Sequence, residues 1–141
     1  MGKEDDDVSE ADCKTDPDLV KEFVERSGCD TLAVSIGNVH GLEAVPKIDL
    51  PLLKKIADVS PVPLVLHGGS GIPFEQVRAM KDYKMLKVNY GSDLRRAYIE
   101  TFGKAYEMDH REANLYGLSM KAVENVRHTS CDLVRTINGY Q

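Results

Sequence analysis

The sequence lacks tryptophan and has few aromatic residues of any kind, at 6% of its 141 residues. Aromatic rings are the surfaces on which unpaired bases stack, so this composition offers few platforms for single-stranded nucleic acid. A basic excess is missing as well. The net charge is −5, and the whole of that acidic excess lies in residues 1–12, while the remainder of the chain is neutral. A neutral body without a basic stripe argues against a nucleic-acid partner.

Long apolar runs and a cysteine framework are also absent. No stretch approaches the roughly 18 apolar residues of a membrane span, and the acidic N-terminus differs from a secretory signal, which begins with a basic region. The three cysteines, Cys13, Cys29 and Cys131, are widely spaced and form no C-x-x-C pair. This usage is typical of reduced thiols in a cytosol. We therefore expect a cytoplasmic protein with no membrane partner.

The composition that remains is that of an ordinary globular chain, with 42% hydrophobic and 29% charged residues. Its length suits about one domain. Apolar spacing predicts short buried strands that alternate with amphipathic helices. The expected strands are residues 31–36, 63–67 and 86–90. The expected helices are residues 15–28, 48–60, 73–80, one from a cap at Ser92 or Asp93 to about 107, and 119–135.

Strands that alternate with helices predict βαβ units and a parallel sheet covered by helices. Three polar, glycine-rich turns, GNVHG, HGGSG and NYGSD, each follow directly on an expected strand. In barrel and open α/β folds the ligand site lies at that carboxyl edge of the sheet. Three strands cannot close a barrel of eight, so the chain is expected to be part of one.

Two histidines fall at this edge. His40 follows the first strand and His67 ends the second, so neighbouring parallel strands would bring both imidazoles to one rim. Zinc takes neutral imidazole nitrogen, and a catalytic zinc site uses three protein ligands with one position left open. The alternative is that each histidine only hydrogen-bonds the backbone of a loop.

The turn at 68–71 is a candidate phosphate site. Glycines there would let backbone N–H groups approach an anion, close to the start of a helix. Glycine also serves tight turns everywhere, so this turn alone is weak support. Asn89, Gly91 and Ser92 form a second polar turn at the same rim, and barrel phosphate sites are frequently assembled from consecutive late loops.

Read in order, VSIGNVHG, PLVLHGGSGIP and KVNYGSDLRRA resemble the C-terminal half of a class II, zinc-dependent ketose-bisphosphate aldolase. The likeness includes the acidic GKEDD and the helix TDPDLVKEFVERSG, and runs along nearly the whole chain. It implies an α/β fold, a partial (β/α)8 TIM barrel with about three to four parallel strands and covering helices. Residues 1–141 would then be the C-terminal portion of one barrel domain, with residues 1–14 as an acidic loop segment.

The resemblance also implies the site. His40 and His67 would be zinc ligands. The phosphate of a dihydroxyacetone phosphate moiety would be held by Gly41, Gly68, Ser70, Asn89 and Ser92. A monovalent cation, Na⁺ or K⁺, often binds near that phosphate in the family. Glu4 matches a loop glutamate thought to exchange a proton with the substrate carbon, whereas taken alone it is one member of a solvated acidic run.

The implied activity is reversible cleavage of fructose or tagatose bisphosphate to dihydroxyacetone phosphate and glyceraldehyde 3-phosphate. The family's remaining zinc histidine and its neighbouring aspartate belong to an N-terminal half that is absent here, and Lys84 stands near the place of a usual glycine. We therefore expect a homo-oligomer or pairing with an N-terminal half. Two alternatives stay open: a non-catalytic zinc- and phosphate-binding or assembly module, and a phosphate-binding barrel enzyme without metal.

Overall fold

The computed structural model describes residues 14–38 and 46–140. The chain divides into two compact units, residues 1–90 and 91–141. The first unit alternates helices and strands as the apolar spacing predicts. In chain order its elements are α1 (Pro17–Ser27), β1 (Leu32–Val34), α2 (Leu50–Val59), β2 (Leu64–Leu66), α3 (Phe74–Ala79), the 3₁₀ helix η1 (Met80–Tyr83) and β3 (Met85–Val88).

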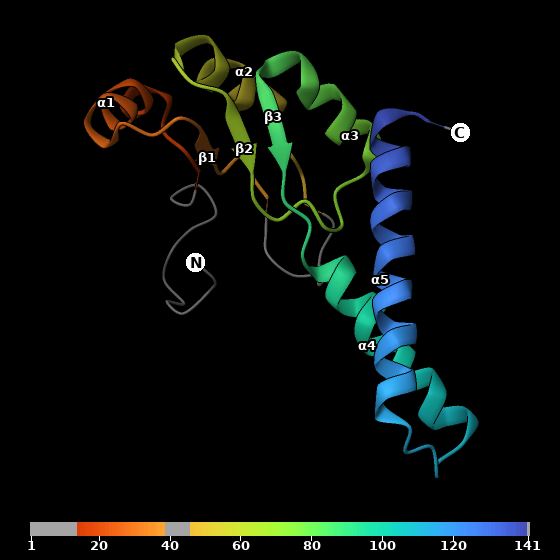
Figure 1. The fold of residues 1–141 in the computed structure, drawn as a ribbon. Coiled ribbons are helices and arrows are strands. Elements are labelled where there is room, and N and C mark those ends of the chain that lie inside the picture. Colours follow the sequence, from red (N-terminus) through yellow and green to blue (C-terminus); the bar gives the residue numbers. More distant parts are fainter. Residues whose placement is uncertain (1–13, 39–45, 141) are drawn as a thin grey trace. The chain divides into compact units, whose positions relative to one another are not determined.

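The strands of the first unit form a parallel sheet in the order β1-β2-β3 (Figure 1). Leu32 pairs with Leu64 and Val34 with Leu66, so β1 and β2 are in simple register. Between β2 and β3 the register shifts once, after Leu64, and Leu66 then pairs with Val88. The expected parallel α/β architecture is confirmed, and the three strands end at the same edge of the sheet.

The core of this unit lies around the central strand. Leu64 and Leu66 of β2 are fully buried, as are Leu53 and Ile56 of α2. The two α2 residues are three apart and therefore share one helix face, which packs inward. A strand that is buried on both faces has a continuous apolar sequence. The apolar run in PLVLH therefore predicts the buried strand β2.

Helix α1 begins and ends where its sequence predicts. The Asp16 side chain caps it by accepting a hydrogen bond from Asp18 N at 3.0 Å, and Pro17 occupies the first helical position. Gly28 ends it with a φ of 65°, a left-handed conformation that favours glycine, and its N–H bonds the carbonyl of Val24. Local chemistry thus determines both ends of α1.

Lys84 adopts the left-handed conformation that a glycine would take more easily, with a φ of 57°. It ends η1 and leads into β3, and its carbonyl accepts from Leu64 N at 3.0 Å. Its Nζ donates to the Ser60 carbonyl at 2.9 Å. A hydrogen bond from a charged group partly offsets the backbone strain of a non-glycine residue here.

Asp49 connects the start of α2 to two other segments. Its Oδ1 accepts from Leu52 N at 3.0 Å, which caps the helix, and its Oδ2 lies 2.9 Å from Lys14 Nζ. The hydrogen bond from Leu52 and the bond from Lys14 hold the pKa of this carboxyl below its ordinary value of 3.8. Its main-chain N–H also donates to the Ile36 carbonyl at 2.8 Å.

Replacing Asp49 by alanine should lower the free energy of unfolding by about 1 kcal/mol, the usual effect of losing an N-cap. Because the folded pKa is depressed, the charge stabilises the protein above pH 3.8 and this contribution is lost as pH falls below that value. Asp49→Asn keeps the cap and removes the charge. Urea unfolding of both variants between pH 7 and 3 tests this. A gap between parent and Asp49→Asn that stays constant with pH would contradict the assignment.

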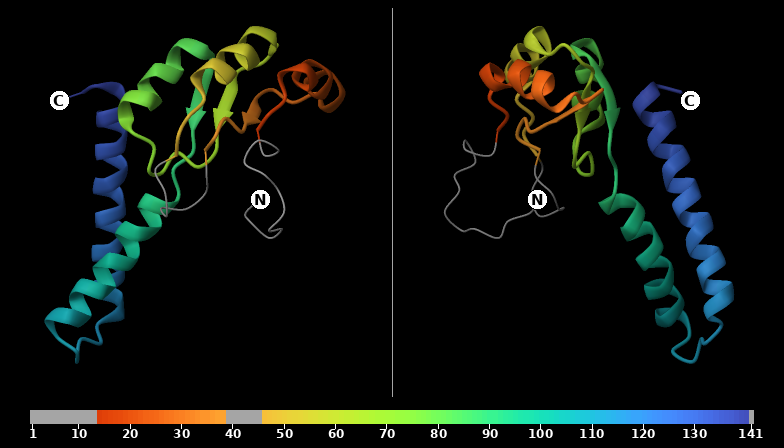
Figure 2. Two further views of the ribbon diagram at one scale, coloured as in Figure 1. Left: turned by 180° about the vertical axis from the view of Figure 1, so that it is seen from behind. Right: turned by 60° about the vertical axis from the view of Figure 1, so that its left-hand side comes forward.

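The second unit is a helical hairpin of α4 (Ser92–Met108) and α5 (Leu115–Asn138), which run antiparallel in both views of Figure 2. Helix α5 extends beyond the expected 119–135 at both ends. The expected cap of α4 by Ser92 or Asp93 is wrong. The N-cap position is Gly91, and no side chain caps the helix by a hydrogen bond. Ser92 is already helical, and its hydroxyl accepts from Arg95 Nη2 at 3.4 Å.

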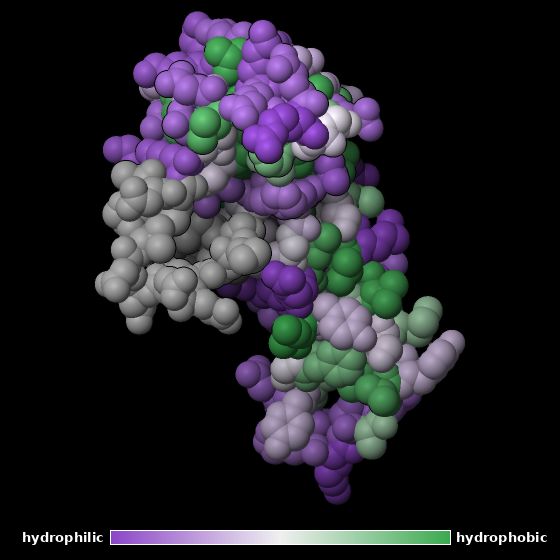
Figure 3. All heavy atoms as spheres, turned by 90° about the vertical axis from the view of Figure 1, so that its left-hand side faces the viewer, coloured by the Kyte–Doolittle hydropathy of each residue, from purple (hydrophilic) through white to green (hydrophobic). Residues whose placement is uncertain are grey.

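Many apolar side chains of this hairpin are exposed. Figure 3 shows apolar surface gathered over the hairpin. The exposed members are Tyr98, Ile99, Tyr106, Met108, Leu115, Tyr116, Met120, Val123, Val134 and Tyr140. No helix among the described residues is both long enough and apolar enough to span a bilayer.

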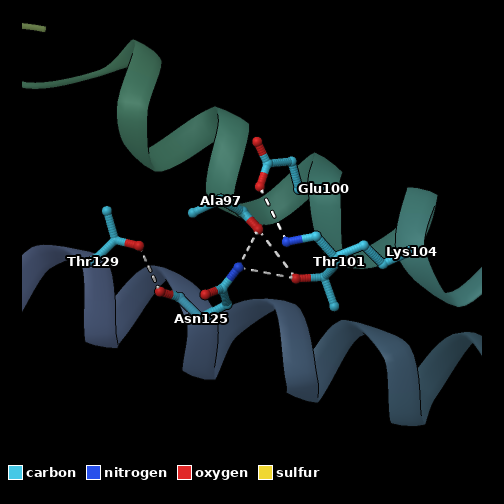
Figure 4. A network of polar contacts seen from close by, with 6 residues as sticks. All are labelled: Ala97, Glu100, Thr101, Lys104, Asn125 and Thr129. Carbon is cyan, nitrogen blue, oxygen red and sulfur yellow. Dashed lines mark hydrogen bonds and ion pairs between the residues drawn. The ribbon is translucent and has the colours of Figure 1, made fainter. Parts of the chain in front are cut away.

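One polar side chain joins the two helices of the hairpin. Asn125 of α5 donates to the Ala97 carbonyl of α4 at 2.7 Å and reaches the Thr101 hydroxyl at 3.3 Å (Figure 4). Thr101 in turn donates to the same Ala97 carbonyl at 3.0 Å. A half-buried amide with defined partners on the facing helix fixes the register of the pair.

Candidate functional site

The carboxyl ends of the three strands carry the three polar turns that the sequence singled out. Val34, Leu66 and Val88 lie side by side in the sheet. Asn38 therefore follows β1, His67 follows β2 and Asn89 follows β3 at one edge. The expectation that these turns meet is confirmed for their described residues, and the reason is the parallel register.

His67 is contacted by residues that follow the two neighbouring strands, β1 and β3. Asn38 Nδ2 donates to the His67 carbonyl at 2.7 Å, while Asn38 Oδ1 accepts from Ile36 N at 2.8 Å. On the other side Asn89 Nδ2 lies 3.0 Å from Nδ1 of the His67 ring. One asparagine thus ties down the main chain of His67 and the other contacts its imidazole.

The turn after His67 is tied to β3 through its second glycine. Gly69 N donates to the Asn89 carbonyl at 2.9 Å, and Asn89 N donates to the Leu66 carbonyl at 2.8 Å. A Cβ at Gly69 would lie 2.5 Å from Val88 Cγ1 and 3.1 Å from the Asn89 carbonyl oxygen, so a larger residue would force these neighbours to shift. This N–H already has a partner, and an anion would have to be bound by other groups of the turn.

The remaining phosphate candidates have different surroundings. Gly68 takes a positive φ of 69°, which turns the chain directly after His67. Ser70 is buried, with 5% of its surface exposed. Ser92 belongs to the second unit, at the first turn of α4.

Three candidates lie outside the described residues: His40, Gly41 and Glu4. Within the described ranges no three histidine, cysteine or acidic side chains are close enough to hold a metal ion together. His67 is an exposed imidazole at this edge, the kind of nitrogen ligand that zinc takes. The Nδ2 end of the Asn89 amide faces its Nδ1 at 3.0 Å.

Asn38 is the residue that sequence reasoning missed. It belongs to the turn GNVHG, in which the sequence alone gives it no role. Its Oδ1 accepts from Ile36 N, two residues earlier in the chain, which is a local contact. Its bond to His67, 29 residues further on, depends on the sheet and has no local sequence signature.

These features define a class of protein: a parallel α/β chain with a histidine and polar turns at the carboxyl edge of its strands. A family model described as fructose-bisphosphate aldolase class-II matches residues 1–139. The chain belongs to this family of aldolases, which are lyases. Its sheet is part of a (β/α)8 barrel, as expected from the sequence.

Individual relatives agree with that assignment. The YdjI protein of Escherichia coli K12 is 44% identical over 84 residues, which are 59% of this chain and 30% of YdjI. The crystal structure of the YdjI aldolase matches with a TM-score of 0.71 and 31% identity, over 87% of this chain and 44% of that chain.

A fructose-bisphosphate aldolase from Campylobacter jejuni has the same TM-score of 0.71 at 20% identity, over 89% of this chain and 45% of that chain, which shows the fold alone. The chain spans less than half the length of these relatives.

Proposed function

We propose that this chain is the C-terminal portion of a zinc-dependent class II aldolase that cleaves a ketose 1,6-bisphosphate. The substrate is fructose or tagatose bisphosphate, and the products are dihydroxyacetone phosphate and glyceraldehyde 3-phosphate. The observation that carries the proposal is that hydrogen bonds join the segments that follow β2 and β3 at the carboxyl edge of the sheet. There Asn89 contacts the His67 ring through its side chain and the Gly69 turn through its carbonyl.

Each site residue has a proposed role. His40 and His67 would hold zinc, which when bound supplies a Lewis acid that polarises a substrate oxygen. Glu4 would move a proton at the substrate carbon next to the broken bond. The substrate phosphate would be bound by Gly41, Gly68, Ser70, Asn89 and Ser92, with Na⁺ or K⁺ nearby.

The proposal extends to the rest of the chain and to its partners. Residues 1–141 would form one portion of a barrel domain, with residues 1–14 as an acidic loop, in a cytoplasmic enzyme without nucleic-acid or membrane partners. In the described sheet, β1 and β3 are the outer strands, and Leu86 of β3 is 67% exposed. Such edges favour pairing with further strands, so we propose a homo-oligomer or assembly with an N-terminal half.

The test is aldol cleavage by the chain alone and after mixing with a separately expressed N-terminal half of a related aldolase. A coupled assay with zinc would follow each bisphosphate. We expect no turnover by the chain alone, because members of a catalytic unit act non-additively, and turnover after mixing. A mixture that associates and binds zinc and phosphate but stays inactive with both substrates would favour a non-catalytic binding module instead.

Ser70→Ala should weaken binding of dihydroxyacetone phosphate by about 1.5–3 kcal/mol, the usual worth of a hydrogen bond to a charged group. Calorimetry of the chain with zinc present would measure this. Ser130→Ala is a matched control. Among the described contacts, the Ser130 hydroxyl bonds only the Val126 carbonyl of its own helix, α5. Equal affinity of parent and Ser70→Ala would remove Ser70 from the phosphate site.

A further inference from the structure

The two helices of the second unit fully bury only small side chains. Helices α4 and α5 have 17 and 24 residues, yet Ala97 and Ala122 are the only residues of the two described helices that are buried. Most of the stability of a helix in a protein comes from packing of its apolar face against other elements. Two alanines provide little of that packing, so we expect a further surface to cover the larger apolar side chains of the hairpin.

These larger side chains follow the helical period. On α4, the rings of Tyr98 and Phe102 are four residues apart, with their centroids at 5.4 Å, and Tyr106 follows after four more residues. Residues three or four apart share one face of a helix. A similar spacing occurs on α5, at Tyr116, Met120, Val123 and Val134. Each helix therefore carries one apolar stripe.

Both stripes lie on the same side of the hairpin. The buried Ala97 and Ala122 mark the line along which the two helices meet. At 3.6 residues per turn, every member of each stripe lies about 100–180° further round its helix from that alanine, in the same sense of rotation. In an antiparallel pair the same sense of rotation leads to the same side (Figure 2). We call the two stripes together the hairpin face, and Figure 3 shows apolar surface over the hairpin.

The opposite side of the hairpin is charged. Several of its side chains form exposed ion pairs, Glu100 with Lys104 at 3.4 Å and Asp132 with Arg135 at 3.7 Å. Its other exposed members are Arg96, Glu107, Lys121 and His128. Such a side is stable in water, so only the hairpin face requires a partner.

The size and composition of the hairpin face fit a protein partner. Tyr116 is 79% and Tyr106 is 62% exposed. The exposed fractions of Tyr98, Met120, Val123 and Val134 lie between 38% and 56%. At about 200 Å² for a large side chain, these fractions correspond to roughly 700 Å², close to the roughly 800 Å² that each partner buries in a stable interface. Tyrosine and methionine are also enriched in the centres of interfaces.

One charged side chain lies within the hairpin face and is already neutralised. Arg127 Nε and Nη2 donate to the two carboxylate oxygens of Glu124 at 2.8 and 2.6 Å. A charge that is buried without a partner is strongly unfavourable, whereas a paired arginine is accepted in interfaces. The face therefore needs no charge of opposite sign from its partner, and an apolar surface of the same kind suits it.

We propose that the hairpin face binds the same face of a second copy of this chain. Two hairpins would then form a four-helix bundle around a two-fold axis, in which one surface patch meets its own copy. This inference rests on the homo-oligomer that is part of the proposed function, and it names the interface of that oligomer. The charged side of each hairpin stays in water.

The experiment is sedimentation equilibrium of the full chain over a wide range of chain concentration. We expect a reversible dimer of the parent. In Val123→Asp two carboxylates would meet, because a two-fold interface contains each side chain twice. Its dissociation constant should rise by about 30-fold or more, as for a central interface residue. Tyr116→Ser, which removes the most exposed ring of the face, should act similarly.

Gly103→Asp is the matched control. It adds the same charge on the opposite, charged side of α4, where a Cβ would meet nothing within 4 Å. Its dissociation constant should equal that of the parent. Far-UV circular dichroism reports whether each variant keeps its helices.

Hydroxyl-radical labelling tests the parent without any substitution. Read by mass spectrometry, labelling of Tyr106 and Tyr116 should fall as rising concentration forms the dimer. Tyr140, which is 68% exposed and lies beyond the end of α5, is the reference whose labelling should stay constant.

The outcomes separate this inference from the proposed catalytic function. A parent that stays monomeric, or a dimer that Val123→Asp and Tyr116→Ser leave intact, overturns the inference. Protection of Tyr106 and Tyr116 only after addition of an N-terminal half of a related aldolase also overturns it, because that half would then be the occupant. A dimer that depends on this face but shows no turnover with the N-terminal half supports the inference while the catalytic proposal fails.

Discussion

Replacing His67 by alanine is expected to abolish zinc binding by this chain. The imidazole is the proposed direct ligand, so its removal should cost more than the roughly 10–100-fold that follows loss of an outer-shell partner. The ring is exposed and its main chain is held by Asn38, so the fold should survive the change. Calorimetric titration with zinc measures the effect.

His128→Ala is the matched control, because this histidine is exposed on α5 and pairs with Glu124. Its zinc isotherm should equal that of the parent. The double variant His40→Ala/His67→Ala gives the decisive comparison. If it binds zinc as the parent does, both histidines are structural and the proposed metal site is rejected.

Gly69→Ala is expected to destabilise the first unit by about 1–3 kcal/mol, the usual effect of overpacking. The new Cβ would meet Val88 Cγ1 at 2.5 Å and the Asn89 carbonyl oxygen at 3.1 Å. Val88 can change rotamer, but the Asn89 carbonyl is held by its bond from Gly69 N. Because the change also displaces Asn89 from His67, zinc affinity should fall together with the free energy of unfolding in urea.

Gly103→Ala provides the control for adding a methyl group. Gly103 lies within α4, and a Cβ there would meet nothing within 4 Å. Alanine is the better helix former by roughly 0.8–1.0 kcal/mol, so this variant should be slightly more stable than the parent. Gly69→Ala with parent stability and parent zinc affinity would show that the close approach to β3 is dispensable.

Local sequence chemistry was sufficient to predict most elements of the first unit. Asp16, Pro17 and Gly28 set the ends of α1, and the apolar run 63–67 contained the buried strand β2. The sequence was a weaker guide to helix ends that depend on contacts beyond their own residues. The cap of α4 fell on Gly91 rather than Ser92, and the α3 region continues as the 3₁₀ helix Met80–Tyr83.

The sequence by itself determined that polar turns follow the strands and that His67 stands where one strand gives way to its turn, because turn residues are a local property of the sequence. Only the tertiary structure decided what touches His67. Asn38 and Asn89 reach it across 29 and 22 residues of chain, through the register of a parallel sheet. The tertiary structure also buries Ser70 and pairs the Gly69 N–H with the Asn89 carbonyl. Hydrogen bonds between neighbouring strands depend on which strands pair, and pairing is decided by packing of the whole sheet rather than by any one segment.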